Sequence, residues 1–484
     1  MKRNKKIIYG LAGVLLFTAC KSDFLNVTPE STIDQEQLNS SAAAALGSLR
    51  GVLATLRSAE TSGYAGHEDY GHKGVLSVLD LMGNDVVMNT LNWGGFNYNY
   101  SGRISTNSRS HYPWFTYYKQ IRNLNVILQN IPEDTGDADL KAVRGQALAL
   151  RGYFHFMLAR IYGPTYVGNG AALSVPINAA TLSSKRNTVE QVYAQIKNDL
   201  ESAVDLLDGY SRGRSRELID KSVALAFLAD VYLEMGLYSD AASAAHEARQ
   251  GYVLLTESQW KNGFYDLTQN ETMWGADINA ELTSFVASFF SHFDNTNTGY
   301  SEGGNISIDK RLYEAMSDQD FRKSAFLGAT GGQFEGKTYD PYISLKFRDL
   351  TSNRTAGDYI YLRSALMYYI EAEALARNAA TESQAKEVLY EITHQRDPNY
   401  TLSTKSGADL IDEIILQKRI EMWGEGFAFF DLKRLKQGVV RDYPDTNHPN
   451  YGKFNISAGD NKFLFMIPQA EVDANSDILP NNPL

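Results

Sequence analysis

The sequence contains little that would cross-link the chain or hold it inside a membrane. Only one of its 484 residues is cysteine, so it can form neither an internal disulfide nor a multi-cysteine zinc or iron–sulfur site. The 57 acidic residues outnumber the 46 lysines and arginines, which argues against nucleic acid as a partner, because Lys and Arg neutralise the phosphates in such complexes. The only sustained apolar run lies near the N-terminus, and we expect no later segment to span a bilayer.

The signatures of common catalytic sites are missing as well. The sequence has no GxSxG, no HExxH and no phosphate-binding GxxxxGK[ST] motif. Glycoside hydrolysis needs two carboxylates, one of them with a raised pKa, on either side of a sugar, and no feature of the sequence nominates such a pair. We therefore predict no catalytic residue and expect that the protein is not an enzyme.

The N-terminus has the pattern of an exported lipoprotein. Four basic residues among the first six precede a short apolar stretch and the residues LFTAC, which end in the single cysteine, Cys20. This order resembles a bacterial lipobox, although Phe17 stands where leucine is more usual. We interpret residues 1–19 as a signal peptide, Cys20 as the lipidated residue, and residues 20–39 as the lipidated N-terminus and a polar tether. The alternative is an ordinary signal peptide with an incidental cysteine.

Helical periodicity with alanine at the contact positions recurs along the chain. In the segment LAFLADVYLEMGLYSDA, Leu225, Leu228 and Tyr232 lie on one helical face and Gly236 ends the helix. The pattern is typical of tetratricopeptide repeats, in which paired helices of about 34 residues pack closely through small side chains. We expect such helices in three stretches, near 140–162, 188–250 and 358–396.

The remaining sequence predicts how these helices are organised. The motifs TVEQ at Thr188 and TESQ at Thr381 are capping-box signatures that predict the first residues of two partner helices. Long insertions near 60–120 and 252–357 are rich in Gly, Asn, Thr, Ser and aromatic residues and have weak periodicity. We predict an all-α, mostly helical fold for one domain over 40–484, with a loop-rich, ligand-facing part that has few short strands.

Five motifs together resemble the SusD/RagB family of surface lipoproteins. They are CKSDFLNVTPES, ALRGYFHFMLARIYGPT, the two later tetratricopeptide-like helices, IILQKRIEMWGEGFAFFDLKRLK and MIPQAEVDANSDILPNNP, in this order along the whole chain. One departure is Gly163-Pro164, where the family has an acidic residue. The resemblance implies a lipid-anchored protein on the outer membrane that binds oligosaccharides without catalysis and delivers them to a SusC-like TonB-dependent transporter. The peptide-binding RagB branch implies a peptide as the alternative ligand.

Candidate ligand-binding residues lie in both insertions. In LNWGGFNYNYSGR, flat rings would stack on a sugar while amides and Arg103 would bind its hydroxyls. Gly94 and Gly95 make a helix unfavourable, so we expect these rings on a loop. In the second insertion Trp274 and Tyr300 are the better candidates, and SFVASFFSHF reads as core or as an interface strand. The predicted ligand-binding residues are Asp69, Asn92, Trp93, Tyr98, Tyr100, Trp274 and Tyr300.

Other polar clusters are better explained by structure than by chemistry. His67 and His72 with their neighbouring carboxylates lack a third imidazole, so we predict no metal site and expect hydrogen bonding at the edge of a pocket. No cofactor is predicted either; a structural calcium is possible but unsupported, because the residues that follow Asp294 do not match the EF-hand spacing. We interpret Glu421 and Glu425 as part of a structural ion-pair network with Asp431 and Arg434.

Two classes of function other than nutrient capture stay open. One is a surface glycoside hydrolase with an all-helical fold, which the missing carboxylate pair disfavours. The other is a scaffold that uses its repeat grooves for protein partners and binds no nutrient.

Overall fold

The computed structural model describes residues 41–484, except 60–61, 64–65, 178–183, 280 and 282–283. The predicted signal peptide, the lipidation of Cys20 and the tether therefore lie outside the described residues. None of the described helices is both long enough and apolar enough to cross a membrane.

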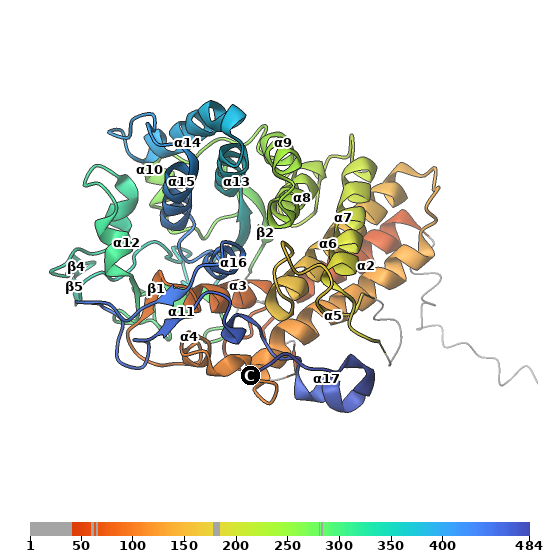
Figure 1. The fold of residues 1–484 in the computed structure, drawn as a ribbon, viewed down its shortest axis with the longest axis horizontal. Helices are drawn as coiled ribbons and strands as arrows, with labels where there is room; N and C mark the ends of the chain where they lie inside the picture. Colours follow the sequence, from red (N-terminus) through yellow and green to blue (C-terminus); the bar gives the residue numbers. More distant parts are fainter. Residues whose placement is uncertain (1–40, 60–61, 64–65, 178–183, 280, 282–283) are drawn as a thin grey trace, which may run out of the picture.

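The longest helices form one continuous array, which runs from right to upper left in Figure 1. Within this helical array α6 packs on α7, α8 on α9, and α13 on both α9 and α14. The mostly helical fold with tetratricopeptide-like hairpins is thus confirmed. The helices of the array are α2 (Ala42–Thr55), α5 (Ser108–Asn130), α6 (Ala138–Tyr162), α7 (Val189–Leu206), α8 (Lys221–Met235), α9 (Tyr238–Ala248), α13 (Ser364–Ala376), α14 (Glu382–Arg396) and α15 (Gly407–Glu421).

Small residues at the helix contacts explain why these hairpins pack so closely. Ala229 in α8 and Ala241 and Ala248 in α9 are fully buried, so the two helix axes approach without large side chains between them. Gly236 ends α8 in the left-handed conformation, with φ of 76°, where a side chain would be strained. The Asp220 carboxylate accepts a hydrogen bond from the backbone N–H of Val223 and caps the first turn.

One of the two predicted capping boxes is present. Thr188 and Gln191 each accept a hydrogen bond from the other's backbone N–H at the start of α7. Helix α14 begins directly after Thr381, as predicted, but the capping box is absent, because the Thr381 hydroxyl donates to the Leu375 carbonyl oxygen instead of accepting from the first turn of α14. The short 3-10 helix η4 (Ala379–Thr381) before α14 supplies the turn in its place.

The rest of the described chain forms a loop-rich region of short elements. Its strands form four separate two-stranded antiparallel sheets, β1–β3, β2–β6, β4–β5 and β7–β8. These elements are α3 (His72–Leu81), β1 (Val86–Met88), α4 (Gly95–Tyr98), η2 (Ser101–Arg103), α10 (Glu257–Trp260), β2 (Thr272–Ala276), α11 (Phe289–Phe293), β3 (Ile306–Ile308), α12 (Lys310–Glu314), η3 (Phe321–Ala325), β4 (Gly332–Phe334), β5 (Lys337–Tyr339), β6 (Tyr359–Arg363), α16 (Ala428–Arg434), β7 (Val439–Val440), β8 (Asn455–Ile456), η5 (Asn461–Phe463), α17 (Gln469–Ala474) and η6 (Ser476–Ile478).

The β1–β3 pair joins the two insertions that the sequence separates. Val86 lies opposite Ile308 and Met88 opposite Ile306, and all six residues of this small sheet are buried. The pairing continues past the strands, where the Asn89 backbone N–H donates to the Asn305 carbonyl oxygen at 2.8 Å. As a result, the residues that follow β1 come to lie beside those that precede β3.

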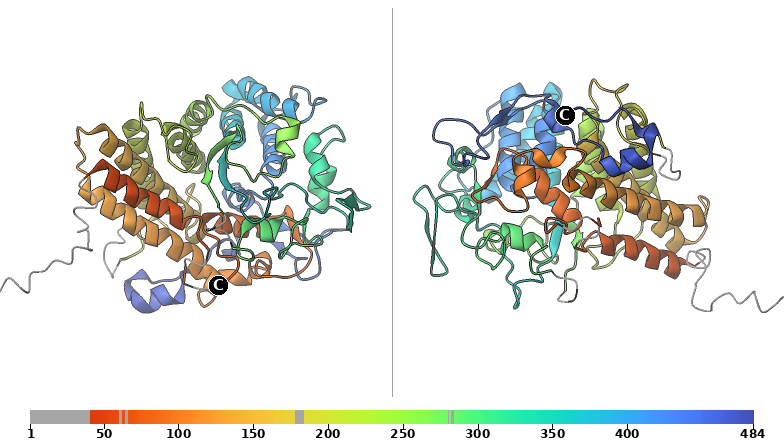
Figure 2. Two further views of the ribbon diagram at one scale, coloured as in Figure 1. Left: turned by 180° about the vertical axis from the view of Figure 1, so that it is seen from behind. Right: turned by 90° about the horizontal axis from the view of Figure 1, so that it is seen from below.

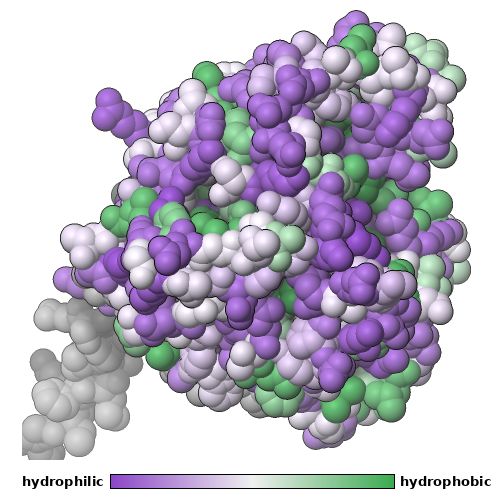
Figure 3. Space-filling model, turned by 90° about the vertical axis from the view of Figure 1, so that its left-hand side faces the viewer, coloured by the Kyte–Doolittle hydropathy of each residue, from purple (hydrophilic) through white to green (hydrophobic). Residues whose placement is uncertain are grey.

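The two regions lie side by side along the molecule. Figure 2 shows, from behind and from below, α2 and α5 at one end and α12 with the β4–β5 hairpin at the other. The face at the α12 end is mostly hydrophilic, and its apolar residues are scattered in small groups (Figure 3). The apolar side chains of both regions are instead buried in a shared core.

Candidate ligand-binding site

Four partly exposed rings from three segments meet where the two insertions join. They are His67, Trp93, Phe96 and Tyr300, which we call the aromatic cluster. The Trp93 indole N–H donates to the Tyr300 hydroxyl at 2.8 Å, and the same hydroxyl is hydrogen-bonded to Nδ1 of His67. The His67 ring centroid lies 4.9 Å from that of Trp93. These contacts hold His67, Trp93 and Tyr300 in one arrangement before any ligand arrives.

The segment that carries Trp93 and Phe96 folds differently from the prediction. Gly95 begins the one-turn helix α4 (Gly95–Tyr98), so the expected loop is wrong at this point. A Cβ at Gly94 would lie 2.7 Å from a Leu81 methyl, which shows that glycine lets this turn pack tightly on α3. The helical turn directs Phe96 outward, 45% exposed, and buries Tyr98.

Tyr300 is held from behind by a buried histidine. Its ring stacks on His292, with centroids 4.9 Å apart, and Nε2 of His292 is hydrogen-bonded to the His67 carbonyl oxygen at 2.9 Å. Burial lowers the pKa of His292 to about 4, so this imidazole is neutral near pH 7. The Asn92 side-chain amide donates to the Tyr300 carbonyl oxygen at 3.4 Å. Asn92, Trp93 and Tyr300 are therefore the predicted site residues that the structure brings together.

The two tyrosines predicted beside Trp93 lie in the core instead. Tyr98 is fully buried, and its hydroxyl is 2.6 Å from Nδ1 of His448. Tyr100 is 5% exposed and donates to the Met82 carbonyl oxygen. Arg103 is also buried and donates to backbone carbonyls near the C-terminus rather than facing solvent. The prediction that these side chains meet a ligand disagrees with the structure, because α4 and η2 turn them inward.

Asp69 and Trp274 are buried for different reasons. Asp69 is 1% exposed, and its carboxylate accepts a hydrogen bond from the Ser62 backbone N–H at 2.9 Å. Trp274, in β2, is 1% exposed and packs against Tyr153 and Phe227 of the helical array. Neither side chain can reach a ligand in this structure. The prediction selects Asp69 as an acidic residue near a histidine, and Trp274 as a tryptophan within an insertion. Neither feature of the sequence distinguishes exposed from buried positions.

The second histidine of the HEDYGH motif serves the core. His72 is fully buried between the hydroxyls of Tyr117, 2.8 Å from Nδ1, and Tyr153, 3.1 Å from Nε2. Burial lowers the pKa of His72 to about 3, which keeps it neutral. Across the described residues, no three His, Cys, Asp or Glu side chains are grouped to hold a metal ion. The second half of SFVASFFSHF contributes buried rings, as expected of core, but as helix α11 rather than a strand, whereas Phe285 in its first half is 52% exposed.

Two models of one family match the chain, one after the other. The model described as "Starch-binding associating with outer membrane" matches residues 23–233, and the one described as "SusD family" matches residues 269–484. The chain belongs to the SusD/RagB family. A SusD-like protein of Formosa agariphila is 26% identical in an alignment of 415 positions that covers 76% of this chain and 79% of that protein.

Solved structures of the SusD superfamily share the fold. A SusD-like carbohydrate-binding protein from Bacteroides vulgatus is 27% identical with a TM-score of 0.79, over 90% of this chain and 97% of that one. A surface glycan-binding protein A from Bacteroides thetaiotaomicron, solved with laminarihexaose, is 17% identical with a TM-score of 0.69, over 91% and 99% of the two chains. At that identity the second likeness concerns the fold alone.

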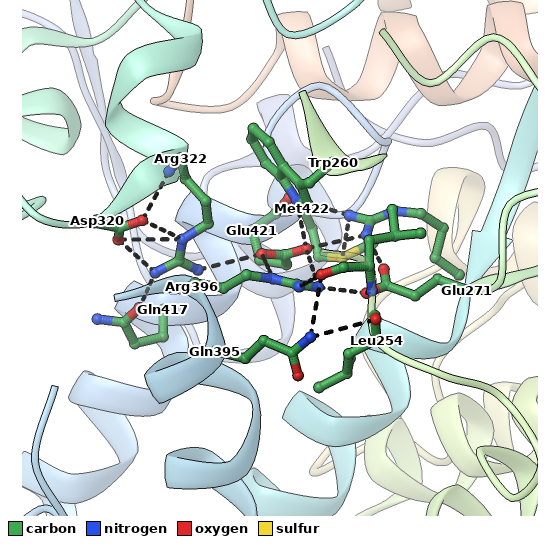
Figure 4. A network of polar contacts seen from close by, with 12 residues as sticks. Leu254, Trp260, Glu271, Asp320, Arg322, Gln395, Arg396, Gln417, Glu421 and Met422 are labelled. Carbon is green, nitrogen blue, oxygen red and sulfur yellow. Dashed lines mark hydrogen bonds and ion pairs between the residues drawn. The ribbon is translucent and has the colours of Figure 1, made fainter. Parts of the chain in front are cut away.

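The segment that resembles the SusD-family signature builds a buried ion-pair network (Figure 4). Glu421 is fully buried 3.0 Å from Arg363, 3.2 Å from Arg396 and 3.4 Å from Arg322. Although burial raises it, these arginines hold the pKa of Glu421 well below its usual range. The Glu421 carboxylate is therefore charged and fully engaged in ion pairs with arginines, as expected of a structural residue.

The composition of this network differs from the prediction. Glu425 pairs with Arg363 at 2.6 Å and Lys346 at 2.8 Å. Asp431 and Arg434 do pair with each other, at 2.9 Å, but they contact Glu373 and Lys418 rather than Glu421. The partner arginines come from β6, η3 and α14, far away in the sequence, and helical spacing alone carries no signal for them.

Proposed function

We propose that this protein is a cell-surface lipoprotein that binds oligosaccharide nutrients at the aromatic cluster and delivers them to a TonB-dependent outer-membrane transporter. The observation that carries the proposal is the hydrogen-bonded pair of partly exposed rings, Trp93 and Tyr300. Indole and phenol faces pack against the C–H face of a sugar, and their polar edges bind hydroxyls. Membership of a family described as starch-binding supports a glycan as the ligand.

The charges near the cluster favour binding without hydrolysis. Of the two acidic residues that follow His67, Glu68 is 2.9 Å from Arg109, and Asp69 is hydrogen-bonded to the Ser62 backbone. Both are at least 95% buried, so neither is placed to protonate a glycosidic oxygen or to attack a sugar. A surface glycoside hydrolase, the alternative class, would release new reducing ends from oligosaccharides, and we expect none.

The binding site is tested by titration calorimetry of the soluble domain. Laminarihexaose and a panel of other neutral oligosaccharides serve as probes, with oligopeptides as the alternative ligands of the same family. We expect an oligosaccharide to bind and Trp93→Ala to weaken it about tenfold or more, the loss of about 1.4 kcal/mol or more of stacking and hydrogen bonding.

The matched control for Trp93→Ala is Tyr390→Ala. Tyr390 is also partly exposed, but it lies in α14 of the helical array, where it stacks on His394. Its loss should leave affinity unchanged. Equal affinity of wild type and Trp93→Ala for the oligosaccharide would exclude the aromatic cluster as the binding site. Binding of oligopeptides but of no oligosaccharide would show that the ligand is a peptide rather than a glycan.

Membrane attachment and delivery are tested in cells. Cys20→Ala should abolish labelling by a fatty-acid analogue and release the protein from the outer membrane, because one cysteine is available for lipidation. Purification of the wild type in mild detergent should recover a large β-barrel transporter. Repeated absence of a transporter from the purified material would contradict delivery. If other protein partners are then recovered and no nutrient binds, the scaffold alternative is favoured.

A further inference from the structure

A buried ion pair lies directly beneath the aromatic cluster. Arg109, in the first turn of α5, has its guanidinium carbon 4.0 Å from the Phe96 ring centroid and 5.8 Å from that of Trp93. Its Nη2 donates to the Trp93 carbonyl oxygen at 3.3 Å and lies 2.9 Å from the Glu68 carboxylate. Arg109 is 8% and Glu68 5% exposed. One side chain thus touches the backbone and both rings of this part of the cluster.

The pair also connects the segments that carry the rings. Glu68 directly follows His67 in the chain, so anchoring Glu68 restricts the backbone from which the imidazole reaches Trp93. Arg109 stands on α5, a 23-residue helix of the helical array. The pair therefore ties the His67 segment and α4 to a rigid helix, and it does so behind the exposed ring faces.

The energetics of the pair argue against a role in stability alone. Burial raises the pKa of Glu68 although Arg109 opposes the shift, and burial lowers the pKa of Arg109. Within the described part of the chain, Oε2 of Glu68 and Nε of Arg109 have no hydrogen-bond partner. A buried ion pair whose desolvation is incompletely compensated adds little net stability, and in some proteins such a pair instead imposes one specific geometry.

We propose that Glu68 and Arg109 are positioning residues, which hold His67, Trp93 and Phe96 in the arrangement that binds the ligand without touching the ligand themselves. This inference rests on the proposed function of the aromatic cluster. The Arg109 guanidinium stacks on the Phe96 ring and restricts its orientation. Its hydrogen bond to the Trp93 carbonyl oxygen fixes the distance between the Trp93 backbone and α5. Ordering the rings in advance lowers the entropy that a ligand must overcome on binding.

The protein offers a test that needs no ligand. Trp93 is partly exposed, whereas the other four tryptophans, Trp114, Trp260, Trp274 and Trp423, are at most 4% exposed. Quenching of tryptophan fluorescence by acrylamide therefore reports on Trp93, and Trp93→Phe gives the baseline. We expect stronger quenching in Glu68→Gln and Arg109→Met, because the indole becomes more mobile. Arg109→Lys, which keeps the charge but not the planar fork, should lie between Arg109→Met and wild type.

A matched control separates positioning from loss of any buried ion pair. Asp199 is 2% exposed and pairs with Arg151 at 2.7 Å between α6 and α7. Asp199→Asn should leave both quenching and ligand affinity at their wild-type values. Glu68→Gln and Arg109→Met should each weaken binding of the oligosaccharide found by calorimetry about tenfold, with melting temperatures no lower than that of the control.

The outcomes distinguish the two proposals. If no oligosaccharide binds the wild type but both variants increase quenching, the proposed function fails and the positioning role stands. If wild type and variants bind equally, or quenching does not change, the positioning role is overturned while the binding function stands. If Glu68→Gln, which keeps the shape of the side chain, fails to fold, the ion pair is required for folding and the positioning role is overturned. Unfolding of Arg109→Met alone leaves the decision to Glu68→Gln.

Discussion

The helical array and the loop-rich region of this protein are built by opposite means. In the array, neighbouring helices in sequence are neighbours in space, and buried alanines such as Ala229 and Ala241 set their spacing. In the loop-rich region, the decisive contacts join distant segments, as when Trp93 donates to Tyr300, 207 residues later. The comparison teaches that local periodicity makes the scaffold, whereas the candidate site exists only through long-range pairing.

Tyrosine has different roles in the two regions. Tyr153 of α6 packs its ring on Phe227, with centroids 4.2 Å apart, and has no part in a surface. Tyr300 instead keeps part of its ring exposed and uses its hydroxyl to order Trp93. The abundance of tyrosine, 29 residues, therefore says little about ligand binding until burial is known.

The largest effect should come from the tryptophan that joins the two regions. Trp274→Ala removes a buried ring between β2 and the helical array, and we expect a loss of about 3–5 kcal/mol in the free energy of unfolding. Trp93→Ala, in the aromatic cluster, should cost less, about 1 kcal/mol, because part of the ring is exposed and one hydrogen bond to Tyr300 is lost. Urea denaturation followed by circular dichroism measures both. Equal losses would break the distinction between a structural and a ligand-facing tryptophan.

The next effect concerns pH, through a buried carboxylate of the loop-rich region. Burial raises the pKa of Glu425, but Arg363 and Lys346 outweigh this and lower it to about 2, from an ordinary value of 4.5. Because the folded-state pKa is the lower one, the ion pair stabilises the protein above pH 4.5, and this stability is lost as the pH falls towards 2. The loss amounts to at most about 3 kcal/mol for this group.

Urea denaturation at fixed pH values measures this dependence. We expect Glu425→Gln to make the free energy of unfolding less sensitive to pH between 4.5 and 2. Glu387→Gln, an exposed change on α14, is the control and should keep the wild-type slope. An unchanged slope in Glu425→Gln would show that the stability of the protein does not depend on this charge.

The smallest effect sharpens the comparison within the helical array. A Cβ at Gly152 of α6 would lie 2.9 Å from the Leu200 side chain of α7, so Gly152→Ala overpacks the hairpin and should cost about 1–3 kcal/mol. Gly47 of α2 is exposed, and a Cβ there would meet no side chain or other segment within 4 Å, so Gly47→Ala should add about 0.5–1 kcal/mol. Thermal and urea unfolding measure both. A gain at Gly152 would mean that close helix approach does not define the array.

Much of the array could be predicted from the sequence, and much of the site could not. The residues around Leu225 and Gly236 follow helical spacing and end signals, and α8 ends at Met235 as expected. Thr381 shows the limit of local motifs, since η4 takes the place of its capping box. In the cluster, Trp93 and Tyr300 were predicted as separate ligand residues, but Arg109 was not, because nothing local marks it as the partner of Glu68.

The sequence by itself determined the helices, the family and the rings that had to be placed, since spacing, caps and motifs act within a few residues. Only the tertiary structure decided which rings reach the surface. The pairing of β1 with β3 brings Trp93 beside Tyr300, while the single turn of α4 sends Phe96 outward and Tyr98 into the core. Burial is a property of what packs on a residue from elsewhere in the chain, and no local pattern specifies it.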